Sequence, residues 1–197
     1  MKVCIVAEGC YPYVVGGVSG WINSLIKSFP NIEFILLAIV ANRSQRGKFV
    51  YELPENLTQV YELYLDDCEW EEGRKTEKSR RKARLSRKEY KEVLNMVLNR
   101  KTDWSVIFDL FHNGEISVDR FLMGPDFFEI ARECYNRQYP NITFSDFLWT
   151  LRSIYLPLFW TLKMDVPKAD LYHCVATGYA GVLGSMAKHF HGSSLLI

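Results

Sequence analysis

The chain has 197 residues, of which 48% are hydrophobic and 14% aromatic, and its formal net charge is +1. A chain of this length can bury a substantial core, its composition excludes wholesale disorder, and its balanced charge gives no general reason to expect nucleic acid binding. The five cysteines are scattered without the spacing of a zinc site, which favours a reducing compartment. No secretion signal is expected, because the first apolar run is short and meets Glu8 at once, and no apolar stretch reaches the roughly 20 residues of a membrane span.

The amino-terminal segment is predicted to form a strand, a glycine turn and a helix. Residues 2–7 are apolar, and Gly16 and Gly17 precede an apolar stripe of helical period that runs from Val18 to Phe29. Such a turn leaves backbone N–H groups unpaired beside the positive end of the helix dipole, which suits a phosphate or a sugar. Glycine brings no Cβ to obstruct a ligand, and it adopts positive φ without strain. The alternative is a tight strand-to-helix connection with no ligand.

Further strands are predicted after this helix. Residues 32–41 are almost continuously apolar and rich in β-branched side chains, which is typical of a strand buried on both faces of a parallel sheet. Residues 49–53 and 58–65 are predicted to form two short strands. The second alternates in polarity, so we expect it near an edge of the sheet.

A helical insertion is predicted at about residues 66–165. It begins with an acidic stretch and a basic run, residues 74–88, that we interpret as a solvated linker or mobile helix. This run contains no aromatic side chain to stack on a base, which argues against nucleic acid. Helix-like apolar spacing then appears in residues 85–98, 104–111, 126–135 and 144–164. The last of these is rich in aromatic residues, which indicates either core packing or a surface for a partner protein or membrane.

The α/β pattern resumes with a strand at 169–175, a turn, a helix at 179–189 and a strand from residue 194. We expect the chain to be a domain cut from a longer protein, because it stops within that strand. His173 lies near the carboxyl end of its strand, where open parallel sheets bind ligands, and therefore at the same edge as Gly16 and Gly17. The alternative is that this histidine only satisfies a backbone carbonyl.

Two other features of these segments suggest close contacts. Gly178, Gly181 and Gly184 recur along the last helix, where glycine costs about 1 kcal/mol relative to alanine, so a close approach to the sheet or a ligand is expected. Glu8, at the end of the first strand, is a candidate acid, base or hydroxyl acceptor. More often a residue in this position caps or hydrogen-bonds a loop, and this is the interpretation we favour.

Several enzyme classes are excluded by their missing motifs. The sequence has no phosphate-binding loop of nucleoside triphosphatases, no H-E-x-x-H zinc motif and no G-x-S-x-G nucleophile turn. A dinucleotide-binding protein remains a weaker alternative, because G-x-G-x-x-G is absent and the second strand ends at Asn42 without a ribose-binding acid.

Two segments carry a resemblance to a known family. The two segments are EGCYPYVVGGVSGW, residues 8–21, and DLYHCVATGYAGVLG, residues 170–184. Together they resemble the amino-terminal domain of the Pel exopolysaccharide type of glycosyltransferase, in retaining family 4. The resemblance implies the amino-terminal half of a GT-B fold: a Rossmann-like, mostly parallel sheet that holds the acceptor and faces a carboxyl-terminal domain that binds the nucleotide sugar. It further implies a hexosyltransferase that uses a UDP-sugar donor and needs no metal or other cofactor.

The resemblance also implies roles for individual residues. Gly16, Gly17 and Val18 correspond to the loop that approaches the donor's diphosphate and sugar, and His173 to the catalytic histidine beside the transferred sugar. The residues expected to hold the acceptor or to line the cleft are Glu8, Tyr11, Tyr13, Thr177, Gly178 and Tyr179.

The sequence departs from this family because residues 1–197 contain no donor-binding domain. We therefore expect a single Rossmann-like domain that is inactive alone and whose partners are its own carboxyl-terminal domain, a nucleotide sugar and a saccharide acceptor. A cytoplasmic location is expected, either free or peripheral to the inner membrane face with a membrane-bound polysaccharide synthesis complex. The alternative from another class is a non-catalytic binding or scaffolding domain of such an assembly, with the aromatic helix at 144–164 as its docking surface.

Overall fold

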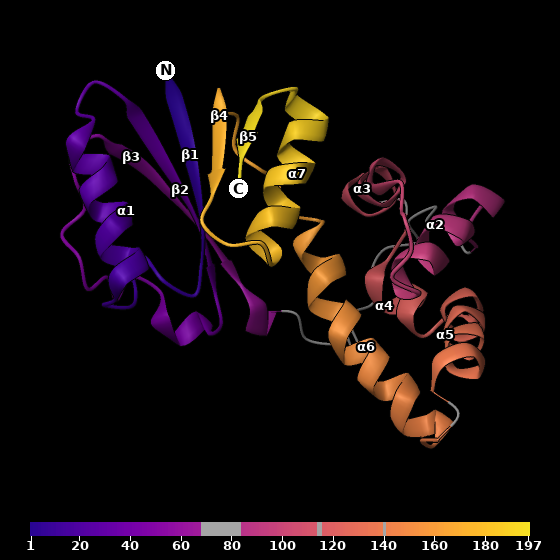
Figure 1. The fold of residues 1–197 in the computed structure, drawn as a ribbon. Coiled ribbons are helices and arrows are strands. Elements are labelled where there is room, and N and C mark those ends of the chain that lie inside the picture. Colours follow the sequence, from indigo (N-terminus) through magenta and orange to yellow (C-terminus); the bar gives the residue numbers. More distant parts are fainter. Residues whose placement is uncertain (68–83, 114–115, 140) are drawn as a thin grey trace. The chain divides into compact units, whose positions relative to one another are not determined.

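The computed structural model describes residues 1–67, 84–113, 116–139 and 141–197. Two compact units make up the chain: an α/β unit of Met1–Cys68 and Asp165–Ile197, and a helical unit of Glu69–Met164. Both appear in Figure 1, coloured along the sequence. Most of the acidic and basic segment at 66–88 lies outside the described residues, so its interpretation as a linker stays a prediction.

The α/β unit contains a five-stranded parallel sheet with the order β3-β2-β1-β4-β5. Its strands are β1 (Lys2–Glu8), β2 (Glu33–Val40), β3 (Leu57–Tyr64), β4 (Leu171–Cys174) and β5 (Ser194–Leu196). This sheet confirms the predicted Rossmann-like α/β class, with the third strand at an edge as expected. The strand order reverses beside β1, because β2 and β3 follow on one side and β4 and β5 on the other.

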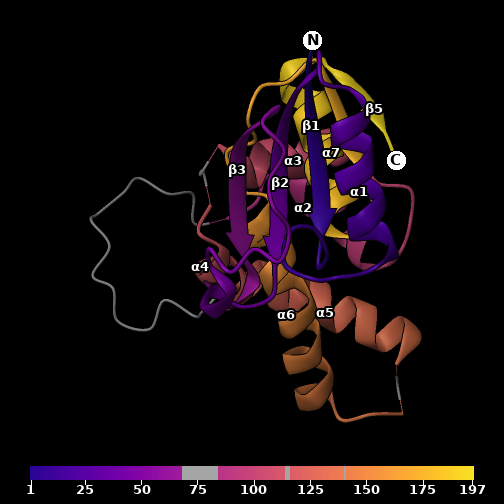
Figure 2. The same ribbon diagram turned by 90° about the vertical axis from the view of Figure 1, so that its left-hand side faces the viewer.

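Helices α1 (Gly17–Ser28) and α7 (Tyr179–His191) cover opposite faces of this sheet, as Figure 1 and Figure 2 show. The α1 side is a hydrophobic cluster in which Ile22 and Ile26 pack with Ile5 and Leu36, all four fully buried. Side chains of a strand alternate between the two faces of a sheet, so β1 contributes residues to the packing on both faces.

The segment at 49–53 does not form the predicted strand. The short helix η1 (Arg43–Gln45) precedes it, and β3 separates it from the second short helix, η2 (Leu65–Asp67). Within the segment, the Val50 N–H donates to the Pro12 carbonyl at 2.9 Å, and the Tyr51 ring packs on Tyr11 with centroids 5.2 Å apart. Its apolar side chains therefore cover the loop after β1 rather than extend the sheet.

The helical unit contains α2 (Arg87–Val97), α3 (Trp104–His112), α4 (Val118–Leu122), α5 (Pro125–Gln138) and α6 (Phe144–Thr161). The four predicted helices are confirmed to within a few residues at their ends. The sequence analysis missed α4, because a helix of five residues is too short to show an apolar period.

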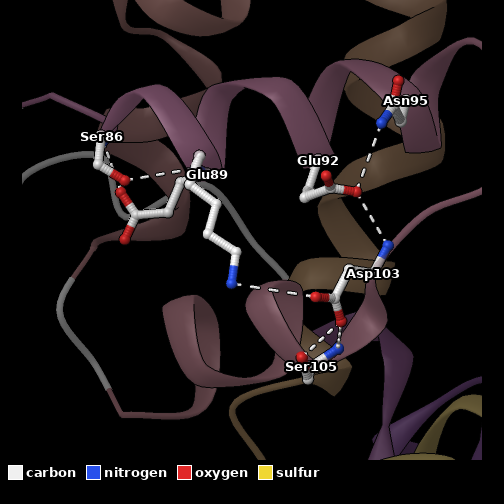
Figure 3. Close-up of polar contacts among 7 residues, drawn as sticks. Ser86, Glu89, Glu92, Asn95, Asp103 and Ser105 are labelled. Atoms are coloured by element: carbon white, nitrogen blue, oxygen red, sulfur yellow. Dashed lines mark hydrogen bonds and ion pairs between the residues drawn. The ribbon is translucent and has the colours of Figure 1, made fainter.

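Polar side chains fix the beginnings of two helices in this unit (Figure 3). Ser86 and Glu89 form a reciprocal capping box at the start of α2. Asp103 accepts the Ser105 N–H at 3.2 Å at the start of α3, and buried Glu92 accepts the Asp103 N–H at 2.9 Å. The loop between the two helices is thus tied to α2 by a carboxylate.

Aromatic rings fill the core of the helical unit. Phe111 stacks on Phe159 with centroids 4.1 Å apart, and Phe121 contacts both rings edge-on. Core packing, one of the two explanations for the aromatic residues of α6, therefore holds for Phe159. Trp149, on the same helix, is 52% exposed and lies beside Arg152 in a cation–π contact. None of the helices in the described ranges combines the length and apolar character needed to cross a bilayer.

Candidate functional site

A pocket of about 400 Å³ lies where the turn into α1 meets the end of β4. Its lining residues are Gly17, Val18, Trp21, His173, Cys174 and Val175. The segments come from opposite ends of the sequence and meet because β1 and β4 are adjacent parallel strands. Open α/β sheets bind ligands at this point, where the strand order reverses. The structure thus brings Gly17, Val18 and His173 together, as the sequence analysis expects.

His173 and Trp21 form one wall of this pocket. Their ring centroids lie 5.4 Å apart with the ring planes at 85°. Burial lowers the pKa of His173 below its ordinary value of 6.5, so its imidazole is neutral at pH 7. Trp21 is 47% exposed, although its spacing places it in the apolar stripe from Val18 to Phe29 that the sequence predicts to pack on the sheet. Its spacing of four residues from Gly17, which puts both on one helical face, is the signal that could have identified it.

The start of α1 carries no side-chain cap. Gly16, at the N-cap position, has an extended backbone with φ of 179°, and no acidic residue occupies the first turn. A Cβ built on Gly16 or Gly17 would meet no atom within 4 Å. The expected positive φ is therefore wrong for Gly16, and what glycine provides here is open space beside uncapped backbone N–H groups. Positive φ falls instead on Gly9, directly after β1.

Glu8 caps the other helix of this unit. Its Oε2 atom accepts the Ala180 N–H at 3.1 Å, so the carboxylate lies at the beginning of α7. A Cβ on Gly178 would come within 2.8 Å of the same oxygen, so a side chain there would displace the Glu8 carboxylate. Of the two interpretations of Glu8, the structure shows the capping contact.

Tyr11 and Tyr13 lie away from the pocket beside His173. Tyr11 is 1% exposed, and burial raises its pKa to about 12, so the expected cleft-lining position is wrong for this residue. Its ring is turned into the core, where it packs on Tyr51. The Tyr13 hydroxyl donates to Glu62, and its ring helps to line a separate cavity of about 140 Å³ with Gly9.

Thr177, Gly178 and Tyr179 form the connection from β4 into α7. Thr177 and Gly178 are exposed, and Tyr179 is half-buried. They follow directly after Val175, which lines the pocket, but none of the three is among its lining residues. Their expected contact with an acceptor stays a prediction.

The sheet order and the pocket at its reversal point define a Rossmann-like α/β protein with a ligand-sized cavity at the usual edge. No cluster of three or more potential metal ligands occurs among the described residues. The whole chain, residues 1–197, matches the family described as "Domain of unknown function (DUF3492)", and the protein belongs to this family. Comparisons with curated proteins and with solved structures give no match.

Proposed function

We propose that this chain is the acceptor-side domain of a retaining, UDP-sugar-dependent glycosyltransferase of exopolysaccharide biosynthesis. The observation that carries the proposal is the meeting of Gly17 and His173 in one pocket at the reversal point of the sheet. The domain family is associated with glycosyltransferase-like proteins, which supports the proposal. The resemblance of residues 8–21 and 170–184 to the Pel type supplies the finer assignment.

The pocket's groups suit the two chemical parts of a nucleotide sugar. Backbone N–H groups in the uncapped first turn of α1 attract a diphosphate, because they carry the positive end of the helix dipole. The neutral imidazole of His173 both donates and accepts hydrogen bonds, so it can hold a sugar hydroxyl next to the reacting carbon. Glu8 is engaged by α7 and is assigned no proton transfer.

A second domain completes the proposed enzyme. In the GT-B arrangement the carboxyl-terminal domain binds the nucleotide, and its basic side chains share the charge of the leaving diphosphate with backbone dipoles, without a metal ion. Residues 1–197 alone are therefore expected to transfer no sugar.

The proposal is tested in a longer protein that includes the second domain. Gly17→Val adds a branched side chain at the pocket lining, and its Cβ would meet no atom within 4 Å. His173→Ala removes the imidazole. Each substitution should lower transfer from a radiolabelled UDP-sugar by at least about a hundredfold, as expected when a preorganised polar contact is lost. Circular dichroism and thermal unfolding check that both variants fold.

His189→Ala is the matched control, because His189 is exposed on α7 and does not line the pocket. It should leave transfer unchanged. Full activity in both pocket variants would overturn the proposal, whereas sugar transfer by residues 1–197 alone would refute only the need for a second domain. A folded longer protein that turns over none of the tested UDP-sugars would favour the scaffolding alternative.

A further inference from the structure

Trp21 is an exposed aromatic side chain inside the pocket. Helix α1 is anchored by Ile22 and Ile26, which are fully buried, whereas Trp21 is 47% exposed and lines the cavity with Val18. The packing of α1 on the sheet therefore leaves about half of this large apolar surface in contact with solvent. Its contact with the His173 ring holds the indole at the pocket wall.

The pocket is lined by apolar and hydrogen-bonding groups that lie next to each other. Trp21 and Val18 offer apolar surface, while the imidazole of His173 and the backbone at Gly17 offer hydrogen-bonding groups. A pyranose ring has the complementary character, because its C–H groups form apolar faces and its hydroxyls project from the rim. An indole is well suited to such a ring, since it gives a large rigid apolar contact at low entropic cost.

We propose that Trp21 is the platform on which a pyranose ring of the substrate stacks, with His173 bound to a hydroxyl at the ring's edge. This inference rests on the proposed function and adds to it a substrate-positioning residue and the part of the substrate that it holds. The pocket volume of about 400 Å³ falls in the range of small-ligand sites and accommodates a single sugar ring.

A nucleobase is the other planar group that an indole would accept. The uncapped first turn of α1 places a diphosphate at Gly17, one helical turn from Trp21. The group nearest to Trp21 would then be the sugar bonded to that diphosphate or the acceptor sugar beside it. The base lies on the far side of the diphosphate and belongs to the second domain in the proposed arrangement.

The test uses the 197-residue chain with ¹⁵N-labelled indole groups, followed by NMR. Trp21→Phe assigns the Trp21 signal among the five tryptophans of the chain. The probes, at up to tens of millimolar, are methyl α-D-glucopyranoside, methyl β-D-galactopyranoside, the methyl glycoside of N-acetylglucosamine, uridine and cyclohexanol. We expect at least one pyranoside to shift the Trp21 signal saturably, and uridine and cyclohexanol to leave it unchanged.

Substitutions then separate stacking from a general effect on the fold. Trp21→Ala has no indole at this position, so its binding is followed by the NMR signals of the pyranoside, and the association constant should be weakened about tenfold, which corresponds to about 1.4 kcal/mol. Trp21→Tyr, which keeps a ring, should restore most of the affinity. Phe29→Ala is the matched control, because Phe29 is a 48% exposed aromatic residue at the other end of α1 and should not affect binding.

Each remaining outcome decides the inference. Pyranoside binding that His173→Ala abolishes and Trp21→Ala leaves unchanged would overturn the role of Trp21 while the proposed function stands. A Trp21 signal that responds to uridine alone, or to no probe, would also overturn it. Stacking confirmed here, together with a longer protein that transfers no sugar, would keep the sugar pocket and reject the glycosyltransferase.

Discussion

At the scale of single residues, Glu8 joins the end of β1 to the start of α7 by a hydrogen bond. Glu8→Ala removes both the acceptor for the Ala180 N–H and a negative charge at a helix N-terminus. Loss of such a cap typically costs about 1 kcal/mol, and we expect the free energy of unfolding to fall by this amount. Glu8→Gln keeps an acceptor oxygen and loses only the charge, so its effect should be smaller. Urea denaturation followed by circular dichroism measures both.

Glu33 provides the control for a surface carboxylate. It pairs with Lys2 at 3.0 Å at the other end of the sheet, with both side chains well exposed. Exposed ion pairs contribute little to stability, so Glu33→Ala should leave the urea midpoint nearly unchanged. If the Glu8→Ala protein and the native chain had the same free energy of unfolding, the capping contact would contribute nothing to stability.

The residues of the pocket could be predicted only in part. Gly17 and His173 are identifiable because strand ends and glycine turns are visible in the sequence, and a general rule places them at one edge of the sheet. Tyr11 is not identifiable, because nothing in a loop sequence shows that its side chain turns into the core against Tyr51. Trp21 was missed because its spacing fits the apolar stripe of the helix. This stripe shows which face of the helix packs on the sheet, but it does not show which of its side chains the sheet leaves exposed.

At the scale of elements, α7 approaches the sheet too closely for a side chain at Gly184. A Cβ there would overlap the Cys174 Sγ atom and come within 2.8 Å of Leu195 Cδ1. Gly184→Ala should therefore destabilise the chain by about 1–3 kcal/mol, as overpacked core substitutions do, despite the better helix propensity of alanine. Thermal and urea unfolding measure the loss. Adding Cys174→Ala, which removes the sulfur, should recover part of it.

Gly20 in α1 is the matched control for Gly184. It is also a glycine within a helix, but a Cβ there would meet no atom within 4 Å. Gly20→Ala should accordingly stabilise the chain by up to about 1 kcal/mol. The two alanine substitutions are thus expected to have opposite signs. If Gly184→Ala were neutral or stabilising, the close approach of α7 to β4 would be refuted.

Elements with a long apolar period were predictable, and those fixed by tertiary contacts were not. The recurrence of glycine in α7 indicated a close approach, which the structure confirms at Gly184; Gly181 makes only an ordinary contact with the Ala176 carbonyl at 3.6 Å. The segment at 49–53 has strand-like composition and yet bonds to the loop at Pro12. Composition gives a residue's preference for a strand, whereas the presence of a neighbouring strand to pair with is a property of the whole sheet.

At the scale of the whole molecule, the sheet is assembled from two distant parts of the chain. The helical unit, Glu69–Met164, separates β3 from β4 in the sequence, close to the insertion of about 66–165 that the composition indicates. The strands themselves could be predicted from apolar runs in the sequence. The pairing of β1 with β4 could not, because it is a long-range contact that no local pattern encodes. It could be anticipated only from the general topology of parallel α/β sheets.

The same assembly predicts how global stability depends on pH through His173, a half-buried residue on β4, where the two parts of the sheet meet. Burial holds its pKa below the ordinary value of 6.5, so the unfolded chain binds a proton more readily than the native state. As the pH falls from about 6.5 toward the lowered native pKa, the free energy of unfolding should therefore decrease. Below the native pKa both states are protonated and this contribution is constant.

Urea unfolding at a series of pH values from 7.5 downward measures this dependence. His173→Gln should reduce the slope of unfolding free energy against pH in that window, because glutamine binds no proton. The matched substitution His189→Gln, at an exposed position of α7, isolates the contribution of His173 by difference. No carboxylate lies among the other described residues that line the pocket, so no direct ion pair compensates for a charged imidazole there. An unchanged slope in His173→Gln would mean that the imidazole is as well solvated in the native state as in the unfolded chain.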